Sequence, residues 1–137
     1  MILDSSVIVA SERRGHDVVQ ILEQIETAHG ESEIGISVVT VAELTHGAYR
    51  TKSGGDRLRR LAFIDELCRD VAVHPLSLAI AKDIGRIAGQ AAAQGIALSF
   101  EDVAIGVTAL HLGFDLATLN IRHFQKIPGL RVVSPIP

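Results

Sequence analysis

Hydrophobic positions along the chain follow two alternating patterns, short apolar runs and longer stretches with helical spacing. Val18, Ile21 and Ile25, for example, recur three or four positions apart and predict one buried face of a helix. Strands are predicted at residues 1–3, 34–36, 71–73, 116–119 and 131–133. Helices are predicted at residues 18–29, 38–50, 58–67, 78–93 and 100–112, with helical turns near residues 7–10 and 124 and a loop turn at 53–55.

Short strands that alternate with longer helices favour a parallel sheet with helices on both faces. The length of 137 residues suits one domain, so residues 1–137 are expected to form a single α/β unit. In such sheets the functional site lies beyond the carboxyl ends of the strands. Asp4, which directly follows the first predicted strand, and the segment after Leu119 are therefore the first places to look for chemistry.

The overall composition excludes several classes of protein. A net charge of -3 argues against nonspecific coating of nucleic acid, so any contact with nucleic acid must be local. The single cysteine, Cys68, cannot form an internal disulfide, and we expect a reducing, cytoplasmic location. No uninterrupted apolar run is long enough to span a bilayer, so no membrane contact is expected.

Three carboxylates occur at the edges of strongly apolar elements. Asp4 follows the first strand, Glu43 lies in the helix that begins after Ser37, and Asp102 opens an almost wholly apolar helix. Each has an ordinary interpretation when it is taken alone. Asp4 and Asp102 suit the first turn or the cap of a helix, and Glu43 suits a solvated helix face.

Taken together, the three acids indicate a different role. Converging carboxylates repel one another and raise each other's pKa unless a cation lies between them. Mg²⁺ and Mn²⁺ prefer oxygen ligands and commonly retain several waters. A cluster of Asp4, Glu43 and Asp102 would therefore suit a hard cation that activates water against a phosphodiester.

Four segments of the chain match, in order, the motifs of one known family. They are Ile-Leu-Asp-Ser-Ser at 2–6, Ile-Ser-Val-Val-Thr-Val-Ala-Glu-Leu at 36–44, Asp-Val-Ala-Ile-Gly-Val-Thr-Ala-Leu at 102–110 and Ala-Thr-Leu-Asn-Ile-Arg-His-Phe at 117–124. The chain thereby resembles the PIN domains, specifically the VapC-type toxins of prokaryotic toxin–antitoxin pairs. The resemblance covers nearly the whole chain, and four motifs in series are more specific than any one of them.

The resemblance implies a Rossmann-like three-layer α/β/α sandwich with a central, mainly parallel sheet. It also implies an endoribonuclease toxin that depends on Mg²⁺ or Mn²⁺, forms a homodimer and is inhibited by a small VapB-like antitoxin. Matched by position, Asp4 and Asp102 would be metal ligands, and Glu43 would complete the acidic pocket directly or through water. Ser6 and Asn120 would hydrogen-bond the carboxylates or the RNA substrate.

The chain departs from the family pattern at His123. Many relatives have an acid at this position, just before the residue that Phe124 matches, so the acids number only three here. Imidazole is a poorer ligand for Mg²⁺ than carboxylate, which favours one tightly held metal ion over two. We expect His123 to donate a hydrogen bond to phosphate or to a neighbouring carboxylate.

Two other functions stay open on the sequence alone. A phosphatase would use Asp4 as its nucleophile, but phosphatases of this kind require a second acid two residues later, where this chain has Ser6. A non-catalytic PIN-like domain would bind RNA or a protein partner without cleaving anything. Metal-dependent cleavage of RNA by the pure protein would separate this second alternative from the ribonuclease.

Overall fold

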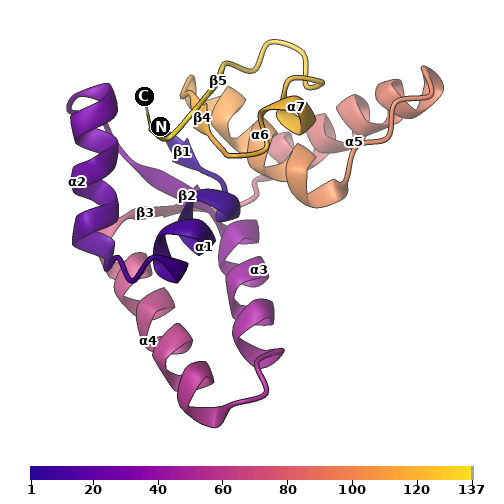
Figure 1. Ribbon diagram of the computed structural model, residues 1–137. Helices are drawn as coiled ribbons and strands as arrows, with labels where there is room; N and C mark the ends of the chain where they lie inside the picture. Colours follow the sequence, from indigo (N-terminus) through magenta and orange to yellow (C-terminus); the bar gives the residue numbers. More distant parts are fainter. Residues whose placement is uncertain (137) are drawn as a thin grey trace.

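The computed structural model describes residues 1–136, so Pro137, the last residue of the predicted domain, lies outside the described residues. Within them, five strands form one sheet in which every neighbouring pair is parallel. The strands are β1 (Ile2–Leu3), β2 (Gly35–Ser37), β3 (Ala72–His74), β4 (Leu116–Ala117) and β5 (Val132–Val133). Their order in the sheet is β3-β2-β1-β4-β5 (Figure 1), which confirms the predicted parallel sheet.

Seven helices cover this sheet in the described part of the chain. They are α1 (Ser5–Arg13), α2 (Val18–His29), α3 (Val38–Tyr49), α4 (Gly54–Asp70), α5 (Leu78–Ala93), α6 (Phe100–Leu112) and α7 (Ile121–Phe124). Serine hydroxyls accept a backbone N–H at the start of α3, α4, α5 and α6, which explains where these helices begin. Gly113 ends α6 with a left-handed backbone at φ 68°.

Several predicted boundaries differ from the structure by one to four residues, and two differences have a clear cause in the structure. The predicted loop turn at 53–55 is wrong, because Ser53 caps α4 by accepting the Asp56 N–H at 3.3 Å and both following glycines belong to the first helical turn. The strand predicted at 116–119 ends at Ala117, because the Leu119 N–H leaves the sheet and donates to Ser6 Oγ at 3.1 Å.

Helices lie on both faces of the sheet because successive strand residues point in opposite directions. Ile2 packs with apolar residues of α5 and α6 and with Phe124. Leu3 packs on the other face with residues of α1, α2 and α4 such as Ile8 and Ile21. Two hydrophobic cores separated by one sheet make the three-layer α/β/α sandwich that was predicted.

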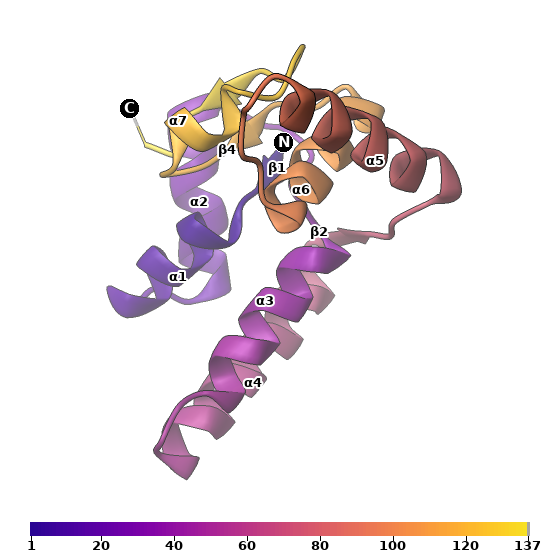
Figure 2. The same cartoon turned by 90° about the vertical axis from the view of Figure 1, so that its right-hand side faces the viewer.

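The hairpin of α3 and α4 projects away from the rest of the molecule, as both views show (Figure 2). Its base carries Glu43 and touches α1 and α6, so the hairpin contributes one wall to the carboxyl edge of the sheet. Among residues 1–136, no helix combines the length and the apolar character that crossing a membrane would require.

Candidate functional site

Asp4 is a buried carboxylate, 3% exposed, at the point where the strand order brings β1 beside β4. Its backbone N–H donates to the carbonyl of Ala117, the last residue of β4, at 2.9 Å, which continues the parallel pairing beyond the end of β1. It occupies the cap position of α1, but its side chain makes no capping hydrogen bond. Instead, Oδ2 accepts hydrogen bonds from Ser6 Oγ at 2.7 Å and from Thr118 Oγ1 at 2.8 Å. These two bonds compensate part of the cost of burying the charge.

The same hydroxyls fasten the segment that follows β4. Ser6 Oγ accepts the Leu119 N–H at 3.1 Å, and Thr118 Oγ1 accepts the Asn120 N–H at 2.9 Å. Asn120 is exposed and its side chain makes no cap for α7. The network thus ties α1, the end of β4 and the start of α7 to one carboxylate, and it leaves the Asn120 amide on the surface beside it.

Glu43 lies in α3, half-buried, and its Oε1 is buried with no hydrogen-bond partner within residues 1–136. Burial, and then the negative charge of Asp4, raise the pKa of Glu43 from 4.5 to about 6. The charges of Asp102 and Glu101 raise the pKa further, whereas the nearby Ser5 hydroxyl lowers it. Carboxylates from α1's cap, α3 and α6 therefore share one electrostatic environment.

Asp102 is the third residue of α6 and is not its cap. Ser99 Oγ accepts the Asp102 N–H at 3.2 Å, so the capping role belongs to Ser99. Asp102 Oδ2 lies 3.6 Å from His123 Nδ1, a distance typical of an ion pair and too long for a hydrogen bond. His123 therefore stands beside Asp102, a predicted metal ligand.

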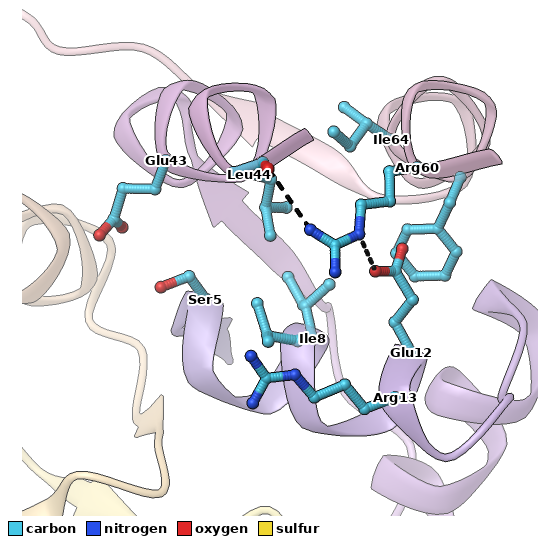
Figure 3. A pocket seen from close by; sticks show the side chains of 11 residues that line it. Ser5, Ile8, Glu12, Arg13, Glu43, Leu44, Arg60 and Ile64 are labelled. Atoms are coloured by element: carbon cyan, nitrogen blue, oxygen red, sulfur yellow. Dashed lines mark hydrogen bonds and ion pairs between the residues drawn. The ribbon is translucent and has the colours of Figure 1, made fainter. Parts of the chain in front are cut away.

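A cavity of about 290 Å³ opens next to the acids, between α1, α3 and α4 (Figure 3). Ser5 and Glu43 lie at one end of it. At the other end Arg60 bonds the Gly47 carbonyl at 3.3 Å and forms an ion pair with Glu12 at 3.7 Å. The arginine thus joins α4 to α1 and α3 and helps to fix the wall that carries Glu43.

Sequence reasoning did not single out Thr118 and Ser5 as site residues. Thr118 binds the same Asp4 oxygen as Ser6, and Ser5 lies beside Glu43 at one end of the cavity. A signal for Thr118 was present, since it follows β4 as Asp4 follows β1, and polar residues at the carboxyl ends of adjacent parallel strands lie close together. Ser5 is one of two consecutive serines, and the sequence alone does not say which of them faces α3.

A parallel sheet of this order, with a buried carboxylate at the β1–β4 junction, is typical of one class of small α/β domains. The family model described as PIN domain matches residues 1–130, and the chain belongs to this family. The predicted resemblance to PIN domains is thereby confirmed.

One protein of similar sequence and two solved structures show which PIN-domain proteins the chain is similar to. The chain is similar to "Ribonuclease VapC1" of Rickettsia felis, with 29% identity over 98% of this chain and 95% of that protein. The solved structure of VapBC-1 from nontypeable Haemophilus influenzae aligns with a TM-score of 0.80 and 25% identity, covering 98% and 96% of the two chains. The DNA-bound VapBC of Salmonella typhimurium, at 24% identity and a TM-score of 0.81 over 98% and 96%, has the same fold.

Proposed function

We propose that this chain is a metal-dependent endoribonuclease toxin of the VapC type, which hydrolyses RNA phosphodiester bonds. The observation that supports this most is the crowding of carboxylates around Glu43. One oxygen of Glu43 is buried without a partner, and burial together with the charges of Asp4 and Asp102 raises the pKa of its carboxyl. Such crowding destabilises a fold unless a cation relieves it.

The donor set fits Mg²⁺ or Mn²⁺ in its chemistry. Within residues 1–136, no three side chains of His, Cys, Asp or Glu lie close enough together to hold a metal ion as they stand. The proposed ligands nevertheless all offer hard carboxylate oxygens, which these cations prefer. Asp4 is held by two hydroxyls, whereas Glu43 has a longer side chain and an unpartnered oxygen that an approaching ion can attract.

Asp4, Glu43 and Asp102 are the residues assigned to the cation, with Glu43 acting directly or through water. A divalent cation in this place supplies an activated water and offsets negative charge on the reacting phosphate. Ser6 and Thr118 both donate to Asp4 Oδ2, so they hold this carboxylate in one orientation. Asn120, on the surface beside them, is assigned to hydrogen-bond the RNA.

The test is incubation of the pure protein with total RNA, with and without Mn²⁺, followed by mapping of new RNA ends. New ends that require Mn²⁺ are expected. Asp102→Asn should reduce cleavage by at least about 100-fold, because it removes a ligand charge from the cation. Absence of cleavage by the folded wild type would favour the non-catalytic alternative, in which the domain only binds RNA or a partner.

A small VapB-like antitoxin and a homodimer complete the proposal. Similarity to solved structures described as VapBC supports such a partner. Expression of this chain alone should arrest growth, and co-expression of a small neighbouring gene should relieve the arrest. If no adjacent small gene relieves it, the antitoxin proposal fails while the ribonuclease proposal stands. Light scattering of the pure protein reports whether it is a dimer.

A further inference from the structure

A second cavity, of about 310 Å³, lies at the start of α6 on the side of α7. It is lined by Ala97, Leu98, Ser99, Asp102, His123 and Lys126. Asp102 thus borders this cavity, while Glu43 and Ser5 line the cavity between α1, α3 and α4. Two nitrogen-bearing side chains, His123 and Lys126, stand in its wall, and both residues are exposed.

The backbone places these two side chains on one side of the same turn. The Gln125 N–H bonds the Ile121 carbonyl at 2.9 Å and the Ile127 N–H bonds the Phe124 carbonyl at 3.1 Å, so helical geometry continues past α7. Residues three apart in such a turn are neighbours on its surface. Buried Phe124 anchors the turn in the core, which fixes where His123 and Lys126 stand relative to α6.

Within residues 1–136, neither side chain forms a hydrogen bond that would occupy it. The side chain of His123 is 68% exposed, and its only polar contact within the described residues is the 3.6 Å approach of Nδ1 to Asp102. Within residues 1–136, Lys126 forms no ion pair with an acid. A cation and an imidazole in the wall of this cavity are therefore available to a ligand that carries negative charge.

An RNA strand carries one such charge on every nucleotide. The acids repel phosphates, and the chain as a whole has a net charge of -3, so attraction to a strand has to come from local donors. If one phosphate lies at the carboxylates, the cavity beside Asp102 offers a place for its neighbour. An acid at position 123 would repel that neighbour, whereas an imidazole N–H can donate a hydrogen bond to it.

We infer that His123 and Lys126 form a binding site for the RNA phosphate next to the scissile one. This inference rests on the ribonuclease function proposed above. Both residues contact the strand away from the reacting bond, so they contribute to substrate affinity and not to the chemical step.

The test measures steady-state cleavage of a short single-stranded RNA that spans a site mapped in total RNA, with Mn²⁺ present. His123→Ala and Lys126→Ala should each raise KM about 5-fold, as one net hydrogen bond is worth, and leave kcat within about 2-fold. Lys126→Ala should also flatten the dependence of log KM on log salt by about 0.7, the contribution of one phosphate contact to a single strand. Lys126→Arg should restore both values.

Lys82→Ala is the matched control, since Lys82 is exposed on α5 and lies outside the cavity. Its KM should equal that of the wild type. Unchanged KM in both test variants, with the wild type cleaving normally, overturns the phosphate site and leaves the ribonuclease proposal standing. A fall in kcat at constant KM overturns it too, because it would place these residues in the chemical step. A wild type that cleaves no RNA refutes the ribonuclease proposal first, and this inference falls with it.

Discussion

Replacing Glu43 with glutamine should stabilise the metal-free protein, although this residue is assigned to the metal site. The amide has nearly the size of the carboxyl but carries no charge, so it removes the repulsion from Asp4 and Asp102 without leaving a cavity. The buried Oε1, which has no partner within residues 1–136, then belongs to a neutral group whose burial costs less than that of an ion.

The magnitude follows from the pKa of Glu43, which burial first and Asp4 second raise from 4.5 to about 6. Between these pH values the folded state binds more protons than the unfolded chain, so the free energy of unfolding falls as pH rises through this window. Above it the ionised carboxyl destabilises the fold by at most about 2 kcal/mol. Solvent screening at this half-buried side chain lowers the expected effect to about 1 kcal/mol.

Urea unfolding with a chelator present measures this effect directly. Glu43→Gln should gain about 1 kcal/mol over the wild type near neutral pH, and the gain should shrink towards zero near pH 4. Glu26→Gln, an exposed position on α2, makes the same change of net charge and should gain nothing. If the two variants behave alike, or if the gain of Glu43→Gln does not depend on pH, the acids do not crowd Glu43 and the argument for a cation loses its main support.

Three further predictions concern the same molecule. Millimolar Mn²⁺ should raise the melting temperature of the wild type by mass action, and Asp4→Asn should blunt that rise; a melting curve indifferent to Mn²⁺ would contradict the metal site. Thr118→Val removes a 2.8 Å bond to the buried Asp4 carboxylate and should cost about 2 kcal/mol in urea unfolding; a neutral effect would mean that water replaces the hydroxyl. Gly106→Ala would bring a Cβ to 2.6 Å from Ile127 Cδ1 and should cost about 1–3 kcal/mol; an undisturbed melting temperature would show that Ile127 moves aside freely.

The long helices were the easiest elements to predict from the sequence. The predicted bounds 78–93 and 100–112 are those of α5 and α6, because Ser99 and Gly113 mark the ends of α6 by local chemistry and Gly95 closes the turn after α5. The strand at 116–119 was predicted two residues too long. Its end depends on the bond from the Leu119 N–H to Ser6, which lies 113 positions away and has no local signal.

The candidate acids were visible in the sequence, but their environments were not. Asp4 was equally compatible with a helix cap, and the segment that follows β4 supplies the Thr118 hydroxyl that binds its carboxylate. Glu43 resembled a residue of a solvated face, since nothing in α3 itself reveals that α1 and α6 bring two more acids beside it. Long-range packing determines both environments, and the periodicity within a single helix carries no information about that packing.

The carboxylates of this site differ in how well the protein satisfies them, and this difference predicts how a cation would be held. Asp4 is buried and held by hydroxyls from α1 and the end of β4, so its position is set by the sheet order. Glu43 comes from the projecting hairpin and keeps an unpartnered oxygen and a raised pKa. A cation would gain a preorganised ligand from the first and relieve repulsion at the second. Stability of the metal-free protein and affinity for the metal should therefore move in opposite directions when Glu43 is changed, as expected where a functional site opposes the stability of the fold.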